Sequence, residues 1–248
     1  AVDIVIEEPK EALYVQLTID WLKKFGVQLE SSNAYRHYRV AGGQKLIGCD
    51  CLVASDWSGV AFPLVAAACT KSNLTITDVD FADSQGDKAV ADVLIRMGAD
   101  IEKDINGHRL VIRGGRPLNG TEIDMDLIPD SLPVLSVAAC FAQGDTHFSN
   151  LAHVRIKETD RVLVMQQVLT ACGADVEITA DSMTVHGGKP IFGASVSSYD
   201  DHRVAMAMSV CGLIAEGEMC IDHPECAAVS FPGFYETMNK VGAGFQLR

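Results

Sequence analysis

Two short charged clusters stand directly before apolar stretches of this chain. Lys157–Arg161 reads Lys-Glu-Thr-Asp-Arg, and Asp200–Arg203 reads Asp-Asp-His-Arg. An apolar stretch after such a cluster is typical of a helix, whose first turn leaves N–H groups unpaired and carries a positive dipole end. Two helix starts with three cations, Lys157, Arg161 and Arg203, predict a site for an anionic ligand. The carboxylates in the same clusters are able to exchange protons with a substrate.

Plainer interpretations of the same residues stay open. A charge run between two apolar runs is most often a solvated loop. His202 also fits a surface histidine at a capped helix start, and Asp130, which precedes Ser131, fits an N-cap residue. Tyr14 fits ordinary packing on its own amphipathic helix. A functional site therefore requires that both clusters converge on one face, because cations share an anion only when they lie close together.

The composition is that of a globular protein with an acidic balance. Hydrophobic residues make up 48% of the 248 residues and charged residues 21%, which argues against extensive disorder. Lys and Arg total 20 against 33 Asp and Glu, so the formal net charge is −13. Nucleic acid is disfavoured as the main partner, because a phosphate backbone requires a basic face. A small anionic substrate stays compatible, since a few local cations can dominate a pocket.

The sequence carries no membrane or metal signature. No apolar run reaches the length of a membrane span, and no signal segment opens the chain, so we expect a cytoplasmic protein. Cys49 and Cys51 form a Cys-x-Cys pair, but no second pair stands at a zinc-like spacing, so no metal site is predicted. Cys69, Cys140 and Cys211 lie in Ala- and Val-rich runs that are typical of buried packing.

One pattern recurs four times along the chain: the end of a helix, a glycine, and the start of a strand. The glycines are Gly26, Gly98, Gly173 and Gly242, at intervals of about 70 residues. Glycine readily takes the left-handed conformation that ends a helix. The pattern predicts a repeated unit of buried helix, strand, amphipathic helix and two strands. We expect an α/β protein whose few units close on one another rather than form an open array.

Three Ala-rich stretches supply the helices that we expect to be buried. They are apolar on nearly every side and span 64–69, 134–141 and 204–214. The first unit lacks such a helix, which suggests that the chain is not self-contained. A break in the pattern near residues 46–58 predicts a domain boundary, with one domain over 1–55 and a second over 56–248.

Four motifs of the chain resemble those of one enzyme family. They are Ile128–Asp130, Lys157–Arg161, Tyr199–Arg203 and Phe231–Phe234. By these motifs the chain resembles the C-terminal portion of the 3-phosphoshikimate 1-carboxyvinyltransferase (EPSP synthase) family, with the N-terminal portion absent. The resemblance implies the enolpyruvyl transferase fold, an inside-out α/β barrel built of repeated βαβαββ-type units, here about one complete lobe plus part of the second. Residues 1–55 would be a partial unit of the other lobe, and residues 56–248 the main lobe of three repeats.

The same resemblance implies a reaction of the shikimate pathway. The family joins phosphoenolpyruvate to shikimate 3-phosphate, giving 5-enolpyruvylshikimate 3-phosphate and phosphate, with no metal or organic cofactor. Carried over by position, Asp130 would hold shikimate hydroxyls and exchange a proton, Glu158 would protonate the methylene carbon, and Lys157 would sit at the reacting centre. Arg161 and Arg203 would grip phosphoenolpyruvate. The other substrate-binding positions that the resemblance implies are Asp201, His202, Tyr14 and His153.

The chain departs from the family pattern at three positions. Glu11 stands where the family has a serine, His153 where it has an asparagine, and Val229 where it has a lysine. A carboxylate at the first position would repel a phosphate, and the missing lysine would remove an anion contact. We therefore expect an enolpyruvyl transferase chain that is inactive alone and that a complementary chain would complete. The alternative is a non-catalytic module that keeps the fold and binds a small anion or a partner chain.

Overall fold

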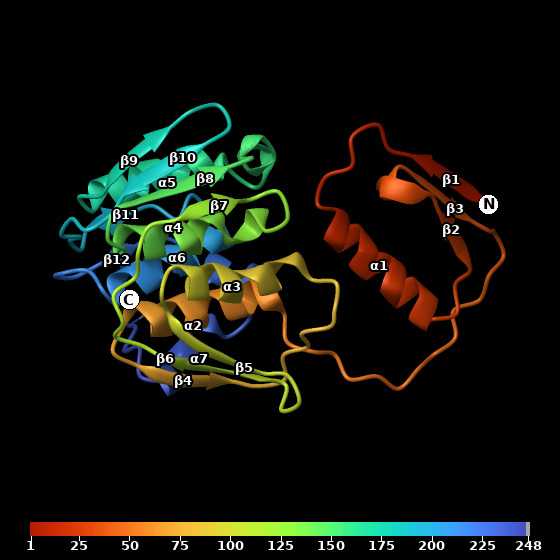
Figure 1. Ribbon diagram of the computed structural model, residues 1–248, viewed down its shortest axis with the longest axis horizontal. Helices are drawn as coiled ribbons and strands as arrows, with labels where there is room; N and C mark the ends of the chain where they lie inside the picture. The colour runs from red at the N-terminus through yellow and green to blue at the C-terminus, as the bar shows by residue number, and fades with distance from the viewer. Residues whose placement is uncertain (247–248) are drawn as a thin grey trace.

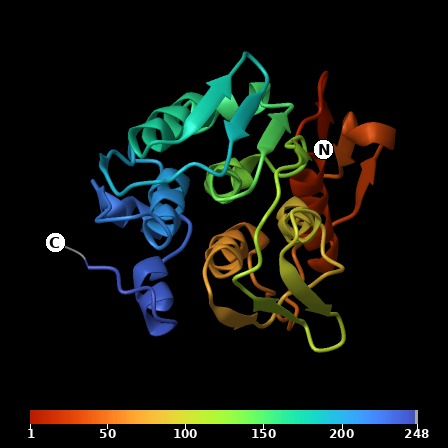
Figure 2. The ribbon, with the colours of Figure 1, turned by 60° about the vertical axis from the view of Figure 1, so that its left-hand side comes forward.

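The computed structural model describes residues 1–246, and its first unit is a small α/β element at one side of the molecule (Figures 1 and 2). Its sheet is antiparallel and has the strand order β1-β3-β2. The elements of this unit are β1 (Val2–Val5), α1 (Ala12–Lys24), β2 (Leu29–Ser31) and β3 (His37–Val40). An irregular segment, residues 41–56, connects it to the rest of the chain.

The second unit opens with a buried helix. Asp56 caps this helix, α2, because its carboxylate accepts hydrogen bonds from the N–H groups of Ser58 (3.2 Å) and Gly59 (3.0 Å). An antiparallel sheet of order β4-β6-β5 follows. The elements are α2 (Trp57–Cys69), β4 (Asn73–Ile76), α3 (Ala89–Arg96), β5 (Asp100–Asp104) and β6 (Arg109–Arg113).

The third unit is the most complete copy and confirms the predicted βαβαββ order. Its elements are β7 (Glu122–Asp124), α4 (Leu132–Cys140), β8 (Asp145–Ser149), α5 (Arg161–Ala171), β9 (Asp175–Ile178) and β10 (Met183–His186). The sheet order is β7-β8-β10-β9, with β7 parallel to β8 and the other pairs antiparallel. The fourth unit repeats the first half of this order as β11 (Ser195–Val196), α6 (His202–Gly212), β12 (Cys220–Ile221) and α7 (Phe234–Lys240), with β11 parallel to β12.

Helices fill the interior and the sheets lie outside them. The three Ala-rich helices α2, α4 and α6 contact one another at the centre (Figure 1). All nine residues of α4 are buried, as the absence of a polar face predicts. The sheet of the third unit has one covered face and one face toward solvent: along β10, Met183 and Val185 are fully buried, while Thr184 and His186 are only half-buried. This arrangement confirms the predicted α/β class with helices inside.

Equivalent glycines in two units confirm the internal repeat in atomic detail. Gly114 and Gly187 each follow the last strand of a unit. A Cβ at Gly114 would lie 2.2 Å from the carbonyl oxygen of Ala67, and a Cβ at Gly187 would lie 2.5 Å from that of Ala139. Both positions therefore require glycine for the same reason, because the chain passes directly over the end of the buried helix of its unit.

Side-chain contacts join the first unit to the main body. Tyr14 hydrogen-bonds Asp87, Asp20 accepts from Ser84, and Glu11 pairs with Lys157. Lys10 Nζ also lies 3.9 Å from Asp126 Oδ1. The position of a domain boundary near residue 55 stays a prediction. Within residues 1–246, no helix has both the length and the apolar character that crossing a membrane requires.

Candidate functional site

Three helix starts bring the charged motifs together. Asp130 lies in the short 3-10 turn Pro129–Ser131 that leads into α4. Arg161 is the first residue of α5, and Arg203 lies in the first turn of α6. Because α4, α5 and α6 pack against one another, their N-terminal ends meet. The structure thus places Asp130, Arg161 and Arg203 in one cluster, although they are far apart in the sequence.

Asp130 is the centre of this cluster. Its Oδ1 accepts a hydrogen bond from Arg161 Nη1 at 2.8 Å, and its Oδ2 lies 3.1 Å from Arg203 Nη2. Lys157 Nζ lies 3.6 Å from Oδ1. Burial alone would raise the pKa of Asp130, but Arg203, Lys157 and Arg161 together hold it below its usual range. Asp130 is therefore a carboxylate at neutral pH, which suits it to accept a proton rather than to donate one.

Arg161 is the most enclosed charge of the cluster, with a fully buried side chain. Its Nε donates to Asp201 Oδ2 at 2.8 Å, and its Nη2 donates to Glu158 Oε2 at 2.5 Å. Together with Asp130, three carboxylates thus occupy most of its guanidinium. In this structure Arg161 is engaged with carboxylates of the chain, which it holds in place. That Arg161 grips a ligand stays a prediction.

Asp201 links the two helix starts. It caps α6 by accepting from the N–H of Arg203 at 2.9 Å, and it also accepts from Thr159 Oγ1 at 3.1 Å. Burial pushes the pKa of Asp201 upward, but the hydrogen bonds and charge of Arg161 bring it below its ordinary value. Asp160 caps α5 in the same way through the N–H of Leu163. The N–H groups of both helices that we expected to face a ligand are therefore partly occupied by carboxylates of the chain.

Glu158 and His202 lie at the rim of the cluster. Glu158 is half-exposed, with 49% of its side chain accessible, and its Oε1 lies 3.9 Å from His202 Nδ1. Burial, and then the charge of Arg203, hold the pKa of His202 below its usual range, so the imidazole is neutral at pH 7. A carboxyl group that reaches solvent beside a neutral imidazole is placed to meet a substrate entering from outside.

Lys157 reaches across to the first unit. Its Nζ pairs with a carboxylate oxygen of Glu11, the residue before α1. The ion pairs of the cluster thus join three cations to four carboxylates. The cations are Lys157, Arg161 and Arg203, and the carboxylates are Glu11, Asp130, Glu158 and Asp201. With three positive and four negative groups, the cluster carries a net negative charge, which the sequence motifs alone did not predict.

Tyr14 contacts a buried carboxyl group, that of Asp87, beside the cluster. Its hydroxyl donates to Asp87, and Asp87 also accepts from Ser131 Oγ at 2.5 Å. Burial holds the pKa of Asp87 above its ordinary value despite these two hydrogen bonds. The loop comes this close because Gly86 has no side chain: a Cβ there would lie 2.1 Å from the carbonyl oxygen of Leu127.

His153 lies on a turn that packs against the turn of Asp130, but it forms no ion pair or hydrogen bond with the charged cluster among the described residues. It belongs to the 3-10 turn Ala152–Ile156, and its Nε2 is buried with no hydrogen-bond partner among the described residues. Val229 is largely exposed at the end of another 3-10 turn. No hydrogen bond or ion pair joins either residue to Asp130 or Arg161 within residues 1–246. The ligand-binding role of His153 and the lost anion contact at Val229 stay predictions.

Two residues join the site that motif reading did not assign to it. Ser58 Oγ lies 3.3 Å from Arg203 Nη2, and Asp87 accepts a hydrogen bond from Tyr14. The sequence placed Glu11 at a substrate position but did not predict its pairing with Lys157. A partial signal was present for Asp87, which ends a Ser-Gln-Gly-Asp string that fits the family. The capping pattern Asp-x-Ser at residues 56–58 signals a helix start, but it does not indicate that an arginine from α6 reaches it.

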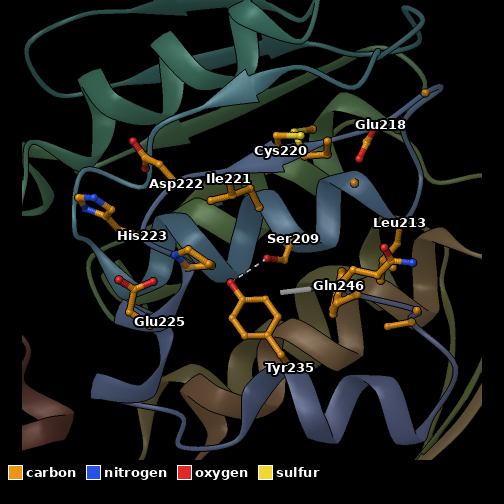
Figure 3. Close-up of a pocket in the computed structure, with 17 residues that line it drawn as sticks. Ser209, Leu213, Glu218, Cys220, Ile221, Asp222, His223, Glu225, Tyr235 and Gln246 are labelled. Carbon is orange, nitrogen blue, oxygen red and sulfur yellow. Dashed lines mark hydrogen bonds between the residues drawn. The ribbon is translucent and has the colours of Figure 1, made fainter. Parts of the chain in front are cut away.

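A large cavity lies elsewhere in the molecule. It has a volume of about 690 Å³ and is lined by the C-terminal half of α6, by β12, by α7 and by residues 243–246 (Figure 3). Among the lining residues, Ser209 Oγ donates a hydrogen bond to the Tyr235 hydroxyl at 3.2 Å. The charged cluster sits at the opposite, N-terminal end of α6. Asp130, Lys157 and Arg203, on which the sequence motifs converge, therefore do not line this cavity.

Comparisons with known proteins agree on one family. The family model "EPSP synthase (3-phosphoshikimate 1-carboxyvinyltransferase)" matches residues 2–238. The chain is 40% identical over 244 residues to a 3-phosphoshikimate 1-carboxyvinyltransferase of Ruminiclostridium cellulolyticum, covering 98% of this chain and 57% of the relative. A protein of the same name from Methanocaldococcus jannaschii is 35% identical over 247 residues, with 57% of its length covered.

Solved structures show the same fold. The EPSP synthase of Acinetobacter baumannii superposes with a TM-score of 0.82 at 31% identity, covering 98% of this chain and 57% of that one. The enolpyruvyl transferase NikO of Streptomyces tendae, at 18% identity and a TM-score of 0.76, supports the fold alone. The chain spans a little over half the length of the curated relatives that it matches. On its sequence motifs, its repeated units and these matches, the chain belongs to the EPSP synthase family.

Proposed function

We propose that this chain forms part of an enolpyruvyl transferase that joins phosphoenolpyruvate to shikimate 3-phosphate. The convergence of Lys157, Arg161 and Arg203 on Asp130, with Glu158 at the rim, carries the proposal. This arrangement provides cations for anionic substrates and two carboxyl groups for proton transfer, in a chain of the EPSP synthase family.

The proposed reaction proceeds by addition and then elimination. The substrate's 5-hydroxyl oxygen bonds to C2 of phosphoenolpyruvate, its proton passes to Asp130, and the methylene carbon C3 receives a proton from Glu158. The C2–O bond to phosphate then breaks, C3 returns its proton to Glu158 as the double bond forms again, and the proton held by Asp130 leaves with the phosphate. The lowered pKa of Asp130 keeps it ionised at neutral pH, so its carboxylate is available to accept this proton.

The cations have separate roles in this scheme. Lys157 lies beside Asp130 and meets negative charge that develops at the reacting centre. The Arg203 guanidinium contacts one carboxylate, that of Asp130, and the hydroxyl of Ser58, whereas that of Arg161 contacts three carboxylates. Arg203 is therefore the better group to bind phosphoenolpyruvate. Asp201 contacts both arginines: it accepts hydrogen bonds from the side chain of Arg161 and from the backbone N–H of Arg203. We assign Arg161 chiefly to positioning Asp130 and Glu158, and Tyr14 to the neighbouring Asp87.

The proposed activity requires a complementary part. The cluster carries more negative than positive groups, so we expect the 248-residue chain alone to release no measurable phosphate from the two substrates. Addition of the part of the Ruminiclostridium cellulolyticum relative that this chain does not cover should restore phosphate release.

Matched variants make this experiment specific. Glu158→Gln in the mixture should lower phosphate release by about 10²- to 10⁴-fold, because a general acid contributes a factor of that size. Glu177→Gln, an exposed strand carboxylate, is the control and should leave the rate unchanged. Equal rates for Glu158→Gln and the unchanged chain would exclude Glu158 as the acid.

A non-catalytic anion-binding module is the second candidate. The observation that favours it is the occupied state of Arg161, whose guanidinium contacts three carboxylates of the chain itself. Under this alternative the complemented mixture binds phosphoenolpyruvate in a titration but releases no phosphate. Phosphate release above the level of the Glu158→Gln variant decides for the transferase.

A further inference from the structure

Glu11 holds an unusual backbone conformation at the edge of the charged cluster. It is the residue before α1, with φ 51 and ψ 41, in the left-handed region that non-glycine residues rarely adopt. Its backbone carbonyl accepts a hydrogen bond from the N–H of Tyr14 at 3.0 Å, but its side chain does not cap the helix. The carboxylate instead extends away from α1 and reaches Lys157.

Lys157 is the cation that Glu11 neutralises. Its side chain is 20% exposed and that of Glu11 29%, so the pair is partly shielded from water and from salt. The other carboxylate near Lys157 Nζ is Asp130 Oδ1, at 3.6 Å. Asp130 is also paired with two arginines, Arg161 and Arg203, whereas Glu11 faces Lys157 directly. Glu11 is therefore the carboxylate that an incoming anion would have to displace from Lys157.

We propose that Glu11 is a built-in competitor for anionic ligands at Lys157 and thereby determines which ligands the cluster accepts. A phosphate group gains the contact with Lys157 only when the Glu11 carboxylate leaves it, because like charges repel at this distance. A group that donates a hydrogen bond, such as a sugar-like hydroxyl, meets the carboxylate without this penalty. The inference rests on the proposed function for its choice of substrate class, but its test does not require catalysis.

Inorganic phosphate is the probe that tests the proposal. The full chain and its Glu11→Gln variant are titrated with phosphate at fixed ionic strength, and binding is followed by calorimetry. We expect Glu11→Gln to bind phosphate at least about tenfold more tightly, equivalent to about 1.4 kcal/mol. Glu8→Gln, which removes an exposed carboxylate three residues away, is the control for general surface charge and should leave the affinity unchanged.

A second substitution shows whether the gain passes through Lys157. Lys157→Met in the Glu11→Gln background should return the phosphate affinity to that of the unchanged chain, and circular dichroism checks that each variant is folded. An unchanged affinity in Glu11→Gln overturns the proposal, and so does an equal gain in Glu8→Gln. If phosphate binding responds as expected but the complemented mixture transfers no enolpyruvyl group, the proposed function fails and this inference stands. The reverse result removes the inference and keeps the function.

Discussion

Arg161 and Asp201 form an ion pair in which neither side chain is exposed to solvent. Arg161 Nε lies 2.8 Å from Asp201 Oδ2, and the pair joins the first residue of α5 to the residue that caps α6. A buried pair of this kind contributes little relative to apolar packing, but removing one partner leaves a buried charge. The pair therefore fixes the relative position of the two helix starts.

Asp201→Asn should lower the free energy of unfolding by about 3 kcal/mol, at the low end of the usual range, because Arg161 keeps two other carboxylates. Chemical denaturation at pH 7 measures this. Glu236→Gln breaks an exposed helix pair with Lys240 and serves as the control, with nearly unchanged stability. Since the pKa of Asp201 is lowered in the folded state, its contribution is present above about pH 4 and is lost as the pH falls through the lowered pKa. Equal effects of both substitutions would contradict the structural role.

Asp87 should give the opposite pH dependence. Its pKa is raised by burial, so the folded chain binds a proton more tightly than the unfolded chain does. The contribution of Asp87 to the free energy of unfolding is highest below about pH 4. This contribution falls as the pH rises toward the raised pKa. Asp87→Asn should therefore gain stability relative to the unchanged chain as the pH rises from 4 to 7. Denaturation curves across this range, with Asp83→Asn as control, provide the measurement. A constant difference across the range would contradict the raised pKa.

Tyr14→Phe should loosen the first unit without unfolding the main body. The substitution removes the hydroxyl that donates to Asp87, a hydrogen bond worth about 1 kcal/mol, and keeps the ring. Hydrogen exchange of α1 should become faster, while that of α4 should not change. Tyr38→Phe, which removes a hydroxyl within the first unit, is the matched control. Equal exchange of α1 in Tyr14→Phe and the unchanged chain would show that the contact does not hold the unit.

Gly86→Ala should disturb the site through the backbone. The added Cβ would lie 2.1 Å from the carbonyl oxygen of Leu127, so the loop must move away from the turn that holds Asp130. We expect a loss of unfolding free energy of about 1 to 3 kcal/mol, typical of overpacking, and a weaker interaction of Asp87 with Ser131. Gly48 has open space around a Cβ and no positive φ, so Gly48→Ala is the control and should leave the free energy of unfolding nearly unchanged. Equal losses in the two variants would contradict overpacking at Gly86.

Local patterns were enough to predict the repeat and its elements. The glycines after each amphipathic helix and the Ala-rich stretches without a polar face have direct physical meanings, and the structure confirms both. The buried helices form α2, α4 and α6, and Gly98 and Gly173 take the expected positive φ. These features depend on neighbouring residues along the chain, which is why a single sequence contains them.

Contacts between distant residues were not accessible in this way. Glu11 and Lys157 are separated by 146 positions, and Asp87 and Ser131 by 44. No periodicity links such pairs, because they meet only through the packing of separate units. The burial of Arg161 was missed for the same reason: the motif predicts a charged helix start, but two of the three carboxylates that enclose it, Asp130 and Asp201, come from other helix starts.

The central contact of α2, α4 and α6 also has a consequence for folding kinetics. These helices begin at Trp57, Leu132 and His202, so each must find partners across long stretches of chain. Closing loops of this size is entropically unfavourable before any apolar surface is covered, and a high contact order slows folding. During synthesis, α2 leaves the ribosome long before α6 exists. We therefore expect its apolar surface to require a chaperone or a transient partner until the third helix arrives.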